Sequence, residues 1–139
     1  MTVVVDASVV IKWLLQDPEN EAGTDKATRL MQFTVEGEQP VLRPIHWLVE
    51  VGAVLARESS ETAAADTIML TALELPTTGD PQILRHGIEL AIELKQPVFD
   101  TLYHAVALES PDTILISADE RYLRAARSKG RIMDLVDWE

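Results

Sequence analysis

Three aspartates of this chain, Asp6, Asp100 and Asp119, stand where a short apolar run gives way to a helical pattern. The runs that precede them have the length and apolar character of buried parallel strands; they cover residues 2–5, 97–99 and 113–116. Each carboxylate is therefore predicted at the carboxyl end of a strand, the edge of an open α/β sheet where ligands bind. Three acids gathered there repel one another unless a cation holds them. Mg²⁺ or Mn²⁺ is the natural candidate, because hard ions prefer oxygen ligands.

A strongly apolar helix predicted over residues 45–57 offers a fourth acid. Its strongly polar residues, His46, Glu50 and Arg57, fall within about 40° of one another on a helical wheel. This stripe faces either bulk water, with His46 and Glu50 as an ordinary i, i+4 pair, or a polar cleft. If it faces a cleft, Glu50 joins the three aspartates.

Each aspartate also has a purely structural interpretation. Asp is a favoured N-cap, and after a strand it can satisfy the free N–H groups of the next helix. Residues 117–120 match a capping box, with Ser117 as the cap and Glu120 reaching back, which leaves Asp119 without a structural task. Capping does not explain why Asp in particular stands at all three strand ends.

Four carboxylates around a divalent ion suit the hydrolysis of a phosphodiester bond. That reaction needs an activated water and a positive charge near the phosphoryl oxygens. We predict Asp6 and Asp100 as the principal metal ligands and Asp119 as a direct or water-mediated ligand. Glu50 is predicted as a ligand or as the residue that orients the attacking water.

Two serines and two histidines accompany these acids. Ser8 and Ser117 are candidates to hydrogen-bond the acids or a scissile phosphate, with helix capping as the alternative for both. His46 and His104 are not assigned a catalytic role, because a single His on an apolar helix is usually a packed core residue.

Basic residues concentrate near the end of the chain, although the formal net charge is −11. Five of the 12 Lys and Arg residues lie between positions 121 and 131, with no acid among them. Either this segment is a solvated helix whose cations meet the negative end of the helix dipole, or it contacts the phosphates of a nucleic acid. For the second interpretation the candidates are Arg121, Arg124 and Arg127.

Length and composition limit the class of protein. A chain of 139 residues that is 47% hydrophobic is expected to form one domain over residues 1–139. The absence of cysteine excludes a disulfide framework, a thiolate zinc site and a cysteine nucleophile. Acidic and basic residues interrupt the apolar start, and no run reaches about 18 apolar residues, so a soluble cytoplasmic protein without a membrane span is expected.

The elements that position these residues alternate between strands and helices. Besides the three runs above, weak strands are predicted at 41–43 and 131–133. A turn is predicted at 17–20, and helices at 8–15, 21–35, 45–57, 60–75, 81–95 and after Asp100 and Asp119, the fifth with Asp80 as N-cap and Pro81 at its first position. This order favours an α/β fold with a parallel sheet between helical layers.

Four short motifs now stand in an order that resembles PIN-domain ribonucleases. They are Asp6-Ala7-Ser8 after the valine strand, Glu50 in the apolar helix, residues 100–105, and residues 117–119 after the last strong strand. More narrowly, the chain resembles the VapC-type toxins of toxin–antitoxin pairs over essentially its whole length.

This resemblance implies a PIN-like three-layer α/β/α sandwich with a central parallel sheet. It also implies a Mg²⁺- or Mn²⁺-dependent endoribonuclease that acts as the toxin of a type II toxin–antitoxin system. Its partners would be an RNA substrate, a cognate antitoxin and, in a homodimer, a second copy of the chain.

Two other classes also fit acids at strand ends. A phosphoryl-transfer domain with a nucleophilic Asp would place them there. One kind of such domain, the haloacid-dehalogenase type, needs a second Asp where this chain has Ser8. The other kind, the response-regulator type, needs a Lys at the end of a late strand, and residues 114–117 contain none. The other class is a catalytically silent binding module whose acidic cleft holds a basic peptide.

Overall fold

A parallel five-stranded sheet forms the centre of the molecule, with strand order β3-β2-β1-β4-β5. The computed structural model describes residues 1–15 and 23–139. In the register of the central pair, Thr2 lies opposite Thr113 and Val5 opposite Ile116. The strands are β1 (Thr2–Val5), β2 (Val41–Pro44), β3 (Thr77–Thr78), β4 (Thr113–Ser117) and β5 (Ile132–Asp134).

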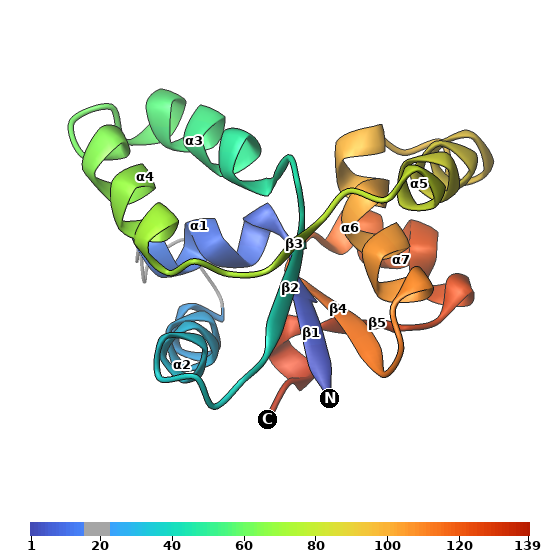
Figure 1. Cartoon of the computed structure of the whole chain (residues 1–139), viewed down its shortest axis with the longest axis horizontal. Helices are drawn as coiled ribbons and strands as arrows, with labels where there is room; N and C mark the ends of the chain where they lie inside the picture. Colours follow the sequence, from blue (N-terminus) through green and yellow to red (C-terminus); the bar gives the residue numbers. More distant parts are fainter. Residues whose placement is uncertain (16–22) are drawn as a thin grey trace.

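Helices cover both faces of this sheet. Figure 1 shows α1 to α4 on one side of the strands and α5 to α7 on the other, and α6 packs on β1, β2 and β4. The helices are α1 (Ala7–Leu15), α2 (Thr24–Val35), α3 (Trp47–Glu58), α4 (Ala63–Ala72), α5 (Pro81–Leu94), α6 (Val98–Glu109) and α7 (Glu120–Ala126), with short 3₁₀ turns η1 (Arg127–Lys129) and η2 (Leu135–Asp137). The predicted α/β/α sandwich with a central parallel sheet is confirmed.

Local sequence signals account for several of these elements. β1 and β4 are almost entirely buried, as expected of β-branched strands with helices on both faces. The side chain of Asp80 accepts a 2.8 Å hydrogen bond from the backbone N of Gln82, Pro81 is the first residue of α5, and Lys95 ends the helix in the left-handed conformation. The predicted cap and both ends of this helix are therefore confirmed.

The strand predicted over residues 97–99 is wrong. Pro97 instead precedes α6, and its carbonyl accepts hydrogen bonds from the backbone N–H groups of Asp100 and Thr101. The Thr101 hydroxyl donates a 2.6 Å hydrogen bond to the carbonyl of Gly87 in α5, which fixes the start of α6. Asp100 consequently lies in the first turn of a helix rather than at a strand end.

Other differences are smaller. The edge strand β3 was not predicted, because two polar threonines carry no strand pattern. The turn predicted at 17–20 and the first residues of the helix predicted over 21–35 lie outside the described residues. No helix in the described part of the chain is long and apolar enough to cross a bilayer.

Candidate metal centre

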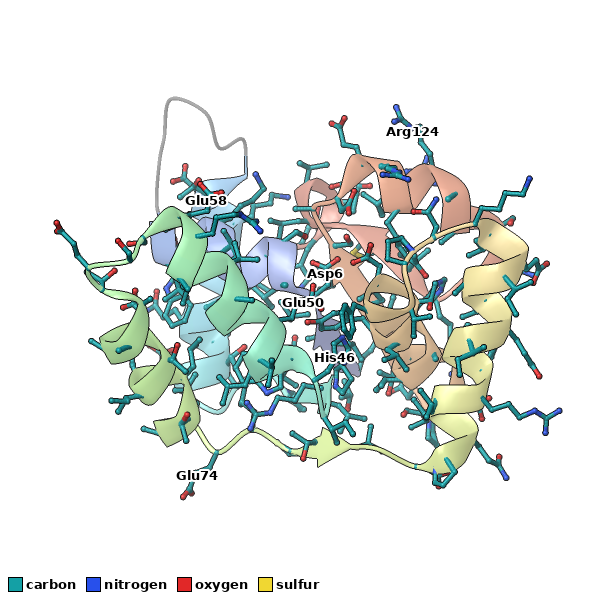
Figure 2. All side chains as sticks on the ribbon, turned by 90° about the horizontal axis from the view of Figure 1, so that it is seen from above. Asp6, His46, Glu50, Glu58, Glu74 and Arg124 are labelled. Atoms are coloured by element: carbon teal, nitrogen blue, oxygen red, sulfur yellow. The ribbon has the colours of Figure 1, made fainter. Side chains whose placement is uncertain are left out.

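A pocket of about 330 Å³ lies at the carboxyl ends of β1 and β4. Its walls include all four predicted acids: Asp6, Glu50, Asp100 and Asp119. Figure 2 shows Asp6, Glu50 and His46 together in the middle of the molecule, whereas Glu58 and Glu74 lie at its outside. The structure thus brings together acids from four separate parts of the chain.

Asp6 is held by hydrogen bonds from the first turn of α1 and from the end of β4. Its Oδ1 accepts from the hydroxyl of Ser8 and from the backbone N of Ser8, and its Oδ2 accepts from the hydroxyl of Ser117 at the end of β4. Each serine hydroxyl also accepts a backbone N–H, from Ala118 at 3.0 Å for Ser8 and from Asp119 at 3.1 Å for Ser117. Both serines therefore orient Asp6, and neither caps a helix.

The surroundings of Asp6 disfavour its charge. Its pKa is raised from 3.8 to about 7, chiefly because burial removes water from the charged form. The carboxylate of Asp119 acts in the same direction, while the hydrogen bonds from Ser117 and Ser8 oppose the shift. A cation placed beside Asp6 would relieve this cost.

Asp100 approaches the same pocket from the first turn of α6. Burial raises its pKa from 3.8 to about 6, and the charges of Glu50 and Asp119 add to that effect. The guanidinium of Arg121 and the imidazole of His46 oppose it. The charges of Glu50 and Asp119 thus raise the pKa of Asp100 although the three residues belong to different elements.

Asp119 has a structural task, contrary to the capping-box interpretation. Its Oδ1 accepts a 3.2 Å hydrogen bond from the backbone N of Tyr122, so Asp119 itself is the N-cap of α7. The predicted cap Ser117 is occupied by Asp6, and no side-chain bond from Glu120 to Ser117 is among those of the described residues. One Asp119 oxygen caps the helix while the side chain still lines the pocket.

The position of Glu50 shows which way the polar stripe of α3 faces. Glu50 lines the pocket, and its Oε2 lies 3.2 Å from Nε2 of His46, one turn earlier. Arg57 lies outside the pocket lining and pairs with Glu58 in solvent. The polar stripe of α3 therefore faces the pocket at Glu50, with His46 packed beside that carboxylate, and faces solvent at Arg57.

The donor set of this pocket fits a divalent cation. As the side chains stand, no group of three or more His, Asp or Glu among residues 1–15 and 23–139 is arranged to hold a metal ion. However, Glu50 Oε2 is buried and accepts no hydrogen bond, which is costly for a carboxylate oxygen. Together with the raised pKa of Asp6, this orphaned oxygen is what a hard ion with oxygen ligands would satisfy.

Sequence reasoning missed one charged residue of the pocket wall. Lys12 on α1 lines the pocket one helical turn after Ser8. The i, i+4 spacing of these residues on the predicted helix was the available signal. His104, in contrast, is buried as expected, with Nε2 donating to the carbonyl of Gly130 at 2.8 Å and Nδ1 accepting from the Tyr122 hydroxyl at 3.0 Å.

The basic segment lies outside the acidic pocket. Arg121, Arg124 and Arg127 are exposed, and the last two border a separate hollow beside Asp134. Figure 2 shows Arg124 at the periphery, away from Asp6. Lys129 pairs with Glu93, and the Arg131 guanidinium donates to backbone carbonyls of Ala107 and Ser110. Three arginines of this run thus remain as candidates for phosphate contact.

Comparisons with known proteins agree with this architecture. The sequence pattern of the PIN domain matches residues 3–128. The crystal structure of PAE2754 from Pyrobaculum aerophilum has a TM-score of 0.65 at 23% identity, over 98% of this chain and 85% of that one. The sarcin-ricin loop cleaving toxin VapC20 of Mycobacterium tuberculosis has a TM-score of 0.59 at 20% identity, over 78% and 82% of the two chains. These likenesses show the fold, and no curated protein sequence matches this one.

Proposed function

The chain belongs to the PIN-domain family, and we propose that it is a metal-dependent endoribonuclease that hydrolyses RNA phosphodiester bonds. The observation that carries this proposal is the pocket where Asp6, Glu50, Asp100 and Asp119 meet. Four separate segments supply these acids, so their meeting is not a by-product of one local structure. In this proposal, residues 1–139 act as a single domain.

In the proposed mechanism, Asp6 and Asp100 would hold Mg²⁺ or Mn²⁺ and Asp119 would bind the ion directly or through water. Glu50 would be a further ligand or the group that orients water. When bound, the ion supplies a positive charge beside the phosphoryl oxygens and lowers the pKa of water. Ser8 and Ser117 keep both oxygens of Asp6 directed by their hydrogen bonds. Glu50 lines the same pocket, where its carboxylate can orient the attacking water.

RNA binding in this proposal uses cations at the border of an otherwise acidic site. Lys12 lies in the pocket wall, and Arg121 is close enough to Asp100 to affect its pKa. Arg124 and Arg127 extend this positive character along α7 and η1. Phosphate contacts by these arginines would hold any RNA sequence, since they read no bases.

We further propose that the nuclease is a toxin that acts on RNA in the cytoplasm and that a cognate antitoxin neutralises it. The fold shared with VapC20 supports this proposal. Exposed apolar side chains also support protein partners, including a second copy of the chain. A row of them follows one face of α5: Leu84, Ile88 and Ile92. Such rows are typical of surfaces that another protein covers.

RNA cleavage in the presence and absence of divalent ions tests the proposed activity. The wild-type protein should cleave RNA with Mg²⁺ or Mn²⁺ and stop when a chelator is added. Asp6→Asn should be inactive, whereas Asp25→Asn, which alters an exposed acid of α2, should cleave at the wild-type rate. Cleavage that continues without metal, or in Asp6→Asn, would contradict the proposal.

A further inference from the structure

His46 lies between the two helices that carry Glu50 and Asp100. It immediately precedes α3 and is one turn before Glu50. Its ring stacks on Phe99 of α6, with ring centroids 5.5 Å apart and an interplanar angle of 18°. The ring centroid of Tyr103 lies 4.8 Å from that of His46. The imidazole therefore fills the junction between α3 and the first turn of α6.

One nitrogen of this ring contacts both helices. Nε2 of His46 lies 2.9 Å from the carbonyl oxygen of Phe99 and 3.2 Å from Oε2 of Glu50. A carbonyl can only accept, so Nε2 carries the proton. This N–H donates to the carbonyl of Phe99, the residue directly before Asp100. The same side of the imidazole ring faces the carboxylate of Glu50.

Burial makes this contact important for Glu50. The side chains of His46 and Glu50 are only 13% and 22% exposed. Glu50 Oε2 and Nδ1 of His46 are buried without a hydrogen bond of their own. Because little water reaches this site, the partial positive charge of the His46 Nε2–H group acts on the carboxylate of Glu50. The hydrogen bond from this N–H to the carbonyl of Phe99 holds the imidazole in place.

We propose that His46 is a positioning residue that sets the placement of Glu50 relative to Asp100, so that both carboxylates serve the same divalent ion. This inference rests on the proposed function. His46 touches neither RNA nor metal in this role. It acts through one N–H that donates to the backbone of α6 and lies beside the carboxylate of Glu50. Residues that contact the ligands of a metal, and not the metal itself, commonly increase metal affinity in this way.

The chain offers a matched control in a second His–Glu pair. Nδ1 of His86 lies 2.7 Å from Oε1 of Glu109 and joins α5 to α6. This pair borders a different hollow, which contains none of the four acids. Removing its imidazole changes a comparable helix-to-helix contact without approaching the acidic pocket.

Calorimetric titration with Mn²⁺ tests the inference in four proteins: wild type, His46→Phe, His46→Gln and His86→Phe. Phenylalanine keeps the ring stack and removes the N–H, whereas glutamine restores an N–H at a similar reach. We expect about 10- to 100-fold weaker Mn²⁺ binding in His46→Phe, near-wild-type binding in His46→Gln and unchanged binding in His86→Phe. Thermal melts without metal confirm folding, and His46→Leu replaces His46→Phe if the latter does not fold.

The outcomes separate this inference from the function on which it rests. Wild-type Mn²⁺ affinity in His46→Phe would overturn the positioning role and leave the nuclease proposal intact. Equal losses in His46→Phe and His46→Gln would also overturn it, because the N–H would then not be the important feature. A wild-type protein that binds no Mn²⁺ would overturn the proposed function and this role together.

Discussion

The hydroxyl of Ser117 donates a hydrogen bond to Oδ2 of Asp6, a residue 111 positions earlier in the chain. The same hydroxyl accepts the backbone N–H of Asp119. A single buried side chain thus connects the end of β1 with the turn that carries another acid of the pocket. It makes the orientation of two carboxylates depend on one hydroxyl group.

Ser117→Ala should therefore weaken both stability and metal binding. Loss of the hydroxyl leaves Asp6 Oδ2 and the Asp119 N–H without their partner, which costs about 1–3 kcal/mol per buried group. Mn²⁺ affinity should fall about 10- to 100-fold. Urea unfolding and calorimetry measure the two effects, with Ser128→Ala in the exposed turn η1 as the control. Wild-type Mn²⁺ affinity in Ser117→Ala would show that Asp6 does not need this support.

Asp100→Asn should separate stability from function. Above pH 6 the Asp100 carboxylate is charged beside Glu50 and Asp119, so its removal should leave the metal-free protein as stable as the wild type or more stable. The rise in melting temperature on addition of Mn²⁺ should disappear, and RNA cleavage with it. Melts with and without the ion decide the matter, with Asp25→Asn as control. An undiminished Mn²⁺-dependent rise in the mutant would remove Asp100 from the ligand set.

Stability of the metal-free protein should fall as pH rises from about 4 to about 7. The folded state raises the pKa of Asp6 from 3.8 to about 7 and that of Asp100 to about 6. Between the unfolded and folded pKa values the folded protein holds protons that the unfolded chain has released, so raising the pH favours unfolding. About one pH unit above the folded-state pKa of Asp6, both states are ionised at these groups and the effect is complete.

Unfolding free energies at pH 4.5, 6 and 8 measure this slope, and Asp100→Asn should reduce it. Affinity for Mn²⁺ should show the opposite trend and increase over the same range, because the ion binds the deprotonated carboxylates. A slope equal in the mutant and the wild type would mean that Asp100 does not contribute.

Substitution of the exposed arginines should weaken RNA binding without regard to sequence. Arg121→Ala, Arg124→Ala and Arg127→Ala should each lower affinity and flatten its salt dependence, since each lost contact to single-stranded RNA reduces the log–log slope by about 0.7. Stability should change little at these exposed positions. Binding measured at several salt concentrations gives the slopes, and Arg85→Ala, paired with Glu89 on α5, is the control. An unchanged slope in a variant with all three substitutions would favour a simple solvated helix.

The sequence was most informative where a local pattern determines the structure. β1 and β4 follow from short β-branched runs, and the start of α5 follows from Asp80 and Pro81. Residues 97–99 misled because a three-residue apolar run fits either a strand or the start of a helix. The hydrogen bond from Thr101 to Gly87, which anchors α6, depends on tertiary structure and leaves no local pattern.

The pocket shows the same division between local and long-range information. The types and order of the four acids indicated that they belong together, although Asp100 reaches the pocket from a helix. Either Ser117 or Asp119 could cap α7, and the contact of Ser117 with distant Asp6 decided between them. The contact between His46 and Phe99 left no local signal for a similar reason, because the two residues lie 53 positions apart.

The acids of the pocket are distributed over all three layers of the fold. Asp6 and Asp119 lie just after the carboxyl ends of β1 and β4 in the sheet. Glu50 belongs to α3 on one side of the sheet, and Asp100 belongs to α6 on the other (Figure 1). An ion that binds all of them would cross-link the three layers and oppose the local unfolding of each. Amide hydrogen exchange should then slow in α3 and α6 together when Mn²⁺ is added, while α2, which contributes no acid to the pocket, keeps its rate.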